Sequence, residues 1–316
     1  MKRTIFLVCI CCLIISTGCK EEKKQQVRAK ENNEKLFRLP DIPANLTRPN
    51  ERAGYLAVHY WDSFNFADSS VIKQPDKMEP LFADFIGILP HASYTDASKG
   101  IKKLMSRVAE NPSLFSNVVG LADKYLYDVN SPMRNEEFYI PFLESIVDSK
   151  VMDEPHKIRF RYQLTMALKN RPDSIATDFT YTLASGTKNS LSKIGSEYTL
   201  LFFNNPDCGI CGEFREKIIA SSVITSMQHS SKNGMKRLTV LSMYTEDDLK
   251  FWRKQLWKNP SGWICGYDEK NEIRNHGLYD LKKIPTIYLL DKEKKVVLKD
   301  ASPEIVMEYF SKKTES

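Results

Sequence analysis

The pattern of apolar and polar positions changes near the middle of the chain. Residues 50–172 carry apolar positions at helical spacing. Within Glu51–Phe66 these positions are Tyr55, Val58, Trp61 and Phe64. Further helices are predicted over Met78–Leu89, Ala97–Ala109, Ser113–Tyr127 and Lys157–Lys169, and a helix start is predicted at Ser131-Pro132. We therefore predict a helical domain over residues 41–175, in which the aromatic side chains form core rather than a ligand groove.

From Asp178 onward, short strands alternate with helices. Strands are predicted over Phe179–Leu183, Tyr198–Phe203, Leu238–Met243 and Trp263–Tyr267, followed by a hairpin of Ile287–Leu290 and Val296–Leu298. Helices are predicted over Cys211–Ala220, Asp247–Leu256 and Pro303–Phe310. Strands and helices in this order predict an α/β sandwich around a mixed sheet over residues 176–316. The expected fold class is α+β with two domains, the helical one first.

The first 40 residues follow neither pattern. Lys2 and Arg3 precede the unbroken apolar run Ile5–Ile15. This run is too short for a membrane-spanning helix, which needs about 20 apolar residues. We predict a signal peptide over residues 1–18, followed by a charged, solvated tether over residues 19–40.

The end of the predicted signal peptide, Ser16-Thr17-Gly18-Cys19, resembles a bacterial lipobox, with Ser16 where Leu is usual. The resemblance implies that Cys19 is acylated and becomes the new N-terminus. A plain signal peptide and an uncleaved anchor remain alternatives. The stretch Cys19–Glu22 also resembles the acidic export signal of surface lipoproteins in Bacteroidota. We expect a lipid-anchored protein of the cell envelope, on the periplasmic face or the cell surface of the outer membrane.

Composition and net charge indicate a globular protein and do not indicate a nucleic-acid-binding one. Hydrophobic residues at 42% and charged residues at 27% are typical of a globular protein. The net charge is +6, and Lys2 and Arg3 in the signal segment contribute two of these charges. A net charge this small, made up of charges of both signs, does not indicate a nucleic-acid partner. Of seven cysteines, those outside the signal segment and the lipid site are Cys208, Cys211 and Cys265.

Cys208 and Cys211 form a Cys-x-x-Cys motif at the predicted junction between a strand and a helix. The N–H groups and the positive dipole end of that helix stabilise a thiolate at Cys208, which favours nucleophilic attack. Cys211, one helical turn later, is placed to resolve a mixed disulfide. We predict thiol-disulfide exchange with exported proteins and an unidentified redox partner. No metal and no organic cofactor are expected.

Together with Ile284-Pro285-Thr286, which precedes a predicted strand, this motif resembles the TlpA/ResA-like branch of the thioredoxin superfamily. The resemblance covers about Asp178–Phe310. It implies a cis Pro285 that lies against the motif and an Ile284 whose backbone docks a bound peptide. The helical half resembles a domain of unknown function found in Bacteroidota lipoproteins, most closely over Lys124–Asp128 and Asn130–Pro132.

The chain departs from the thioredoxin pattern at three points around the motif. Asp207 stands where Trp is frequent, and Ile210 stands before the second cysteine where Pro is frequent. The strand Tyr198–Phe203 lacks the buried acid that many members of the family carry. These departures bear on the redox potential and on the direction of electron flow.

Three alternatives to this function remain open. An inert Cys208–Cys211 disulfide would stabilise little, because it closes a loop of only two residues. A zinc site could use Cys208, Cys211, Cys265 and His276, although Cys265 is predicted to lie in a separate strand. The motifs of copper carriers and peroxidases do not match this spacing. The remaining alternative is a non-catalytic binding or assembly lipoprotein of the outer membrane that uses the thioredoxin fold as a scaffold.

Overall fold

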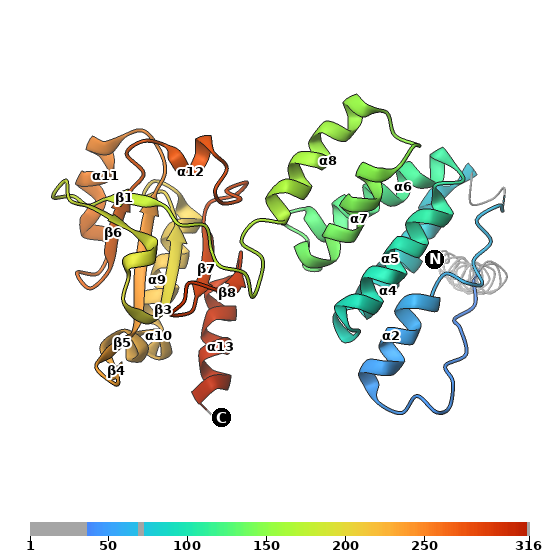
Figure 1. Cartoon of the computed structure of the whole chain (residues 1–316), viewed down its shortest axis with the longest axis horizontal. Helices are drawn as coiled ribbons and strands as arrows, with labels where there is room; N and C mark the ends of the chain where they lie inside the picture. The colour runs from blue at the N-terminus through green and yellow to red at the C-terminus, as the bar shows by residue number, and fades with distance from the viewer. Residues whose placement is uncertain (1–36, 69–72, 315–316) are drawn as a thin grey trace, which may run out of the picture. The chain divides into compact units, whose positions relative to one another are not determined.

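The computed structural model describes residues 37–68 and 73–314. The chain divides into two compact units, Met1–Lys157 and Ile158–Ser316, which we call the helical unit and the sheet unit (Figure 1). The predicted signal peptide, most of the predicted tether and Cys19 lie outside the described residues. Within the described ranges, no helix is both long and apolar enough to cross a membrane.

Over the described residues before α8, the helical unit contains five α-helices with short helical turns between them. The α-helices are α2 (Pro49–His59), α4 (Glu79–Ile88), α5 (Tyr94–Val108), α6 (Pro112–Ala122) and α7 (Glu136–Asp148). The turns are η1 (Pro75–Met78), η2 (Leu89–His91) and the π-helical η3 (Asp123–Tyr127). Helix α8 (Glu154–Ala167) contains the division between the units, earlier in the chain than the predicted boundary at residue 175.

Two of the predicted helix ends in this unit are wrong. The helix predicted over Glu51–Phe66 ends at His59. Beyond it the Phe64 ring packs edge to face against the Phe66 ring, and residues two apart do not face each other on a helix. Trp61 and Phe64 are nevertheless buried, as is Tyr139, so the prediction that these aromatic residues form core is confirmed for them. Tyr125 and Tyr127 are only half-buried.

The second wrong prediction is that a helix starts at Ser131-Pro132. Helix α7 begins at Glu136, where the Asn135 side chain accepts the Phe138 N–H at 3.2 Å. The Ser131 hydroxyl instead donates to the Tyr125 carbonyl at 2.6 Å and closes the turn after η3. The Ser131 side chain therefore bonds to a carbonyl six residues earlier in the chain, whereas the sequence pattern predicts that it caps a helix.

The sheet unit contains one mixed sheet. Its strands are β1 (Thr180–Thr182), β2 (Lys188–Ser190), β3 (Ser196–Phe203), β4 (Ser231–Lys232), β5 (Met235–Tyr244), β6 (Ile264–Tyr267), β7 (Thr286–Leu290) and β8 (Val296–Lys299). The strand order is β2-β1-β6-β5-β3-β7-β8, with β4 paired to β5. Strand β3 is central: it runs parallel to β5 and antiparallel to β7. The helices are α9 (Gly209–Ala220), α10 (Ser222–His229), α11 (Leu249–Gln255), α12 (Glu272–Asn275) and α13 (Pro303–Thr314), with the 3-10 turns η4 (Leu191–Lys193) and η5 (Leu256–Lys258).

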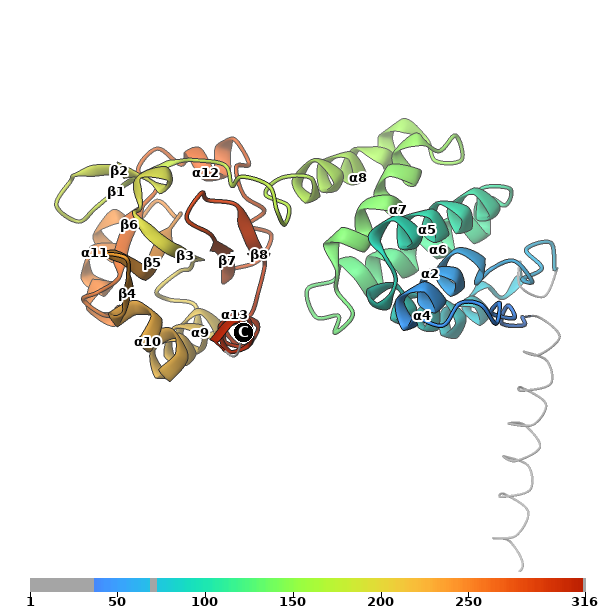
Figure 2. The same cartoon turned by 60° about the horizontal axis from the view of Figure 1, so that its bottom comes forward.

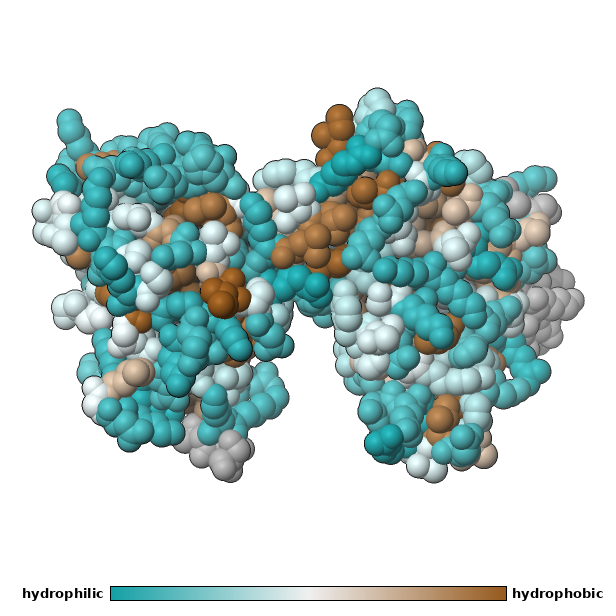
Figure 3. Space-filling model, viewed as in Figure 1, coloured by the Kyte–Doolittle hydropathy of each residue, from teal (hydrophilic) through white to brown (hydrophobic). Residues whose placement is uncertain are grey.

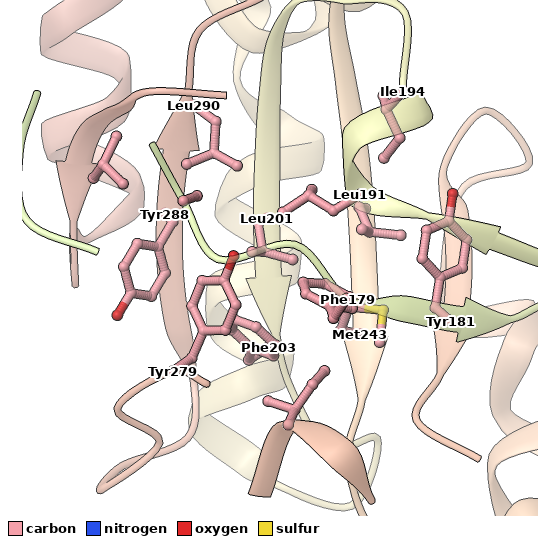
Figure 4. Close-up of a cluster of buried hydrophobic side chains, with 14 residues drawn as sticks. Phe179, Tyr181, Leu191, Ile194, Leu201, Phe203, Met243, Tyr279, Tyr288 and Leu290 are labelled. Carbon is pink, nitrogen blue, oxygen red and sulfur yellow. The ribbon is translucent and has the colours of Figure 1, made fainter. Parts of the chain in front are cut away.

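Alternate residues of β3 point to opposite faces of the sheet and belong to two separate cores. Tyr198, Leu200 and Phe202 pack in one core with residues of α9, α10 and α13. Figure 2 shows these three helices along one side of the unit, with β1, β2 and α12 along the other. Leu201 and Phe203 belong to the second core, which is drawn in Figure 4. Because both faces of the sheet are covered, the apolar run of residues 200–203 is buried on both sides.

The second core covers the opposite face of the sheet, and some of its side chains come from segments outside the strands. The Tyr279 ring lies 5.0 Å from the Phe203 ring and 5.6 Å from the Phe179 ring, centroid to centroid (Figure 4). On the face of the molecule seen in Figure 3, hydrophilic residues predominate in the sheet unit and apolar residues occur in separate patches. Buried apolar side chains thus cover both faces of β3 up to Phe203, which precedes the turn to α9.

Candidate functional site

Cys208 lies at the start of α9, directly after the central strand β3. Residues 204–207 form the turn between them, where the Cys208 N–H donates to the Asn205 carbonyl at 3.1 Å. Cys208 is the N-cap residue of α9, and its Sγ accepts the Cys211 N–H at 3.2 Å. The predicted junction of strand and helix is therefore confirmed, although the helix begins at Gly209 and not at Cys211.

The two thiols of the motif differ in their access to solvent. Cys208 is partly exposed, whereas Cys211 is fully buried. Burial raises the pKa of the Cys211 thiol to about 12, and its hydrogen bond with Cys208 acts in the same direction. Cys208 is therefore the more accessible of the two residues. The predicted roles, attack by Cys208 and resolution by Cys211, require this order of access and stay predictions.

The loop before β7 places Ile284 and Pro285 beside the Cys-x-x-Cys motif. The Ile284–Pro285 peptide bond is cis, as the family resemblance implied. The Cys208 Sγ lies 3.8 Å from the Ile284 carbonyl oxygen, although the two residues are far apart in the sequence. Pro285 is buried, and Ile284 is only partly buried. The structure thus brings together the four residues that the sequence proposed for this site.

A buried polar cluster next to the motif was not predicted from the sequence. Its members, which we call the Arg215 cluster, are Arg215, Asn204, Asn259, Ser242 and Cys265. The Arg215 Nε donates to the Asn259 Oδ1 at 3.0 Å, and its Nη2 donates to the Asn204 Oδ1 at 3.3 Å. One signal was available: Arg215 follows Cys211 by four residues, which places both side chains on one face of α9.

The third cysteine belongs to this cluster and not to a group of metal ligands. Cys265 lies in β6, where its Sγ accepts from the Asn259 Nδ2 at 3.4 Å, and burial raises its pKa. His276 is exposed just after α12. Over residues 37–68 and 73–314, no three His, Cys, Asp or Glu side chains gather as metal ligands.

Comparison with solved structures identifies the family. The chain is similar to a thioredoxin-like protein from Bacteroides caccae, with 45% sequence identity and a TM-score of 0.81 over 88% of this chain and 98% of that chain. The chain belongs to this family of thioredoxin-like proteins. The expected fold class, a helical part followed by a thioredoxin-like domain with a mixed sheet, is confirmed.

Other comparisons match single parts of this thioredoxin-like chain. The C-terminal domain of an uncharacterized protein from Bacteroides fragilis is 45% identical over 45% of this chain and 98% of its own length, with a TM-score of 0.43. A conserved protein of unknown function from the same species is 36% identical over 44% of this chain and 98% of its own, with a TM-score of 0.41. Residues 16–170 match the family described as "Domain of unknown function (DUF5106)". No curated protein matches the chain.

Proposed function

We propose that this thioredoxin-like chain is an exported, lipid-anchored thiol-disulfide oxidoreductase that exchanges disulfides with exported proteins. One observation carries the proposal. The accessible Cys208 Sγ lies between the first turn of α9 and the Ile284 carbonyl, with the buried Cys211 one turn away. The N–H groups at a helix N-terminus stabilise a thiolate, and the second thiol is close enough to displace a bound partner.

The proposed reaction needs only the two thiols and a substrate disulfide. The Cys208 thiolate attacks one sulfur of the substrate, a bond forms between them, and the other substrate sulfur leaves with the electron pair. Cys211 then loses its proton and attacks the Cys208 Sγ. The Cys208–Cys211 disulfide forms, the second substrate thiolate leaves, and it takes up a proton. The reverse sequence oxidises a substrate dithiol, with an unidentified redox partner restoring the pair.

We expect Cys208 and Cys211 to behave as one reversible redox couple. Equilibration of the purified protein with glutathione buffers, followed by alkylation and peptide mass mapping, measures the couple and its potential. In the dithiol form Cys208 should be alkylated first, because Cys211 is buried. A pair that stays locked as a disulfide, or two thiols that react independently, would favour the alternative of a non-catalytic scaffold.

The lipid anchor has its own test. We expect Cys19→Ala to release the protein from the membrane fraction, because no acyl chain can then be attached. Cys12→Ala, in the apolar run of the same segment, is the matched control and should leave the protein in that fraction. If Cys19→Ala also stays membrane-bound, the segment is an uncleaved anchor. Protease treatment of intact cells then distinguishes display on the cell surface from the periplasmic face.

A further inference from the structure

Arg215 is a buried cation beside the motif, and the proposed exchange has so far given it no role. Its side chain is only 6% exposed and lies on α9, one turn after Cys211. Side chains of a helix lean toward its N-terminus, so the Arg215 side chain is directed back toward the turn that carries Cys211. Placing a charge in such a position costs free energy unless an opposite charge or hydrogen bonds compensate it.

The hydrogen bonds that hold the guanidinium come from neutral groups. Asn204 and Asn259 accept from it through their amide oxygens. Asn204 is fixed in turn, because its Nδ2 donates to the Ser242 Oγ at 2.8 Å. Among the ion pairs found within residues 37–68 and 73–314, none joins Arg215 to a carboxylate. The cluster therefore orients a positive charge without neutralising it.

The groups that can supply the opposite charge are the thiols. Burial lowers the pKa of the guanidinium, and the charge that most opposes this shift is that of Cys211, followed by Cys265 and Cys208. The Glu216 carboxylate contributes least of the four. On Cys211, burial raises the pKa of the thiol most; a backbone hydrogen bond with Asn205 and, to a smaller extent, the positive charge of Arg215 lower it.

We infer that Arg215 is a positioning residue for the second step of the exchange, where its guanidinium stabilises the Cys211 thiolate that resolves the mixed disulfide. The inference rests on the proposed function. In this step Cys211 gives up its proton, its Sγ bonds to the Cys208 Sγ, and the bond between Cys208 and the substrate sulfur breaks. The substrate thiolate leaves with that electron pair and is protonated, and Cys211 itself carries a negative charge only between the loss of its proton and the formation of the new bond. Residues 198–203 lack the buried acid that many relatives carry, and in this chain the fixed cation favours ionisation directly.

One assay separates the two steps. Reduced protein is mixed with an aromatic disulfide whose released thiolate absorbs visible light, and release is followed by stopped flow. The first phase reports attack by Cys208, and the second phase reports resolution by Cys211. We expect Arg215→Met to slow the second phase by about tenfold and to move its pH profile to higher pH, since an opposite charge nearby favours ionisation. The first phase should change by about twofold or less.

Matched variants test the charge itself. Arg215→Lys keeps a cation and should restore most of the second phase and its pH profile, which a purely structural role would not. Lys217→Met removes an exposed cation from the same helix and should leave both phases unchanged. Lys258, whose Nζ donates to the Pro206 carbonyl at 3.0 Å, remains in every variant. If Arg215→Met does not fold, Arg215→Gln keeps a donor without the charge, and the same result is expected of it.

The outcomes separate this inference from the proposed function. A wild-type protein without a fast first phase would overturn the proposed exchange. A fast first phase, with a second phase that Arg215→Met or Arg215→Gln leaves unchanged in rate and pH profile, would overturn the role of Arg215 alone. A second phase slowed equally by Arg215→Lys would also overturn it, because the charge would then not be the cause.

Discussion

Replacing Cys208 by Ser is expected to abolish disulfide exchange, with a loss of about a thousandfold or more. A serine hydroxyl at this position is not ionised near neutral pH, and it cannot form the mixed disulfide. The buried Cys211 cannot take over, because it is fully shielded from solvent and burial raises its pKa to about 12. The measurement is reduction of a model protein disulfide by the pre-reduced purified protein.

Two further variants make this prediction specific. Cys211→Ser should still react at Cys208 but stop at the mixed disulfide, which mass spectrometry would detect as an adduct on Cys208. Cys265→Ser changes the third thiol and should still form and resolve the mixed disulfide, because both exchanging sulfur atoms, those of Cys208 and Cys211, are kept. Full exchange by Cys208→Ser would contradict the proposed roles. An unchanged cellular phenotype of that variant would instead favour the scaffold alternative.

Gly100→Ala is expected to destabilise the helical unit by about 2–3 kcal/mol. Gly100 lies in α5, where α2 crosses it so closely that a Cβ would lie 2.1 Å from the Ala57 carbonyl oxygen. This atom belongs to the backbone, so the helices must move apart, and the gain in helix propensity from Ala, about 1 kcal/mol, does not compensate. Urea unfolding followed by far-UV circular dichroism measures the change.

Gly120→Ala is the matched control for that variant. Gly120 lies in α6, and a Cβ there would have no atom within 4 Å. We expect it to leave stability unchanged or to raise it by about 0.5–1 kcal/mol, since Ala loses less backbone entropy on folding. Exchange at Cys208 in the same samples shows whether the sheet unit is intact. Equal stability of the Gly100→Ala and Gly120→Ala proteins would contradict the close crossing of α2 and α5.

The sequence by itself determined the parts of this protein that depend on local patterns. The apolar run of Tyr198–Phe203 predicted the central strand, because a strand covered on both faces has no polar alternation. A Cys-x-x-Cys motif soon after it predicted thiols at a helix N-terminus. Both features are set by a few neighbouring residues, so they can be recognised without knowing the fold. The position of Ile284-Pro285 against the motif was implied by the resemblance to the thioredoxin superfamily and not by a local pattern.

Only the tertiary structure decided the features that depend on contacts between distant residues. The Arg215 cluster joins the end of β3, helix α9 and the segment after η5, and no periodic pattern marks its hydrogen bonds in the sequence. The helix end at His59 and the hydrogen bond of the Ser131 hydroxyl to a carbonyl six residues earlier were also not predicted, although they involve nearer residues. Local propensities differ by about 1 kcal/mol or less per residue, so buried non-local contacts readily override them.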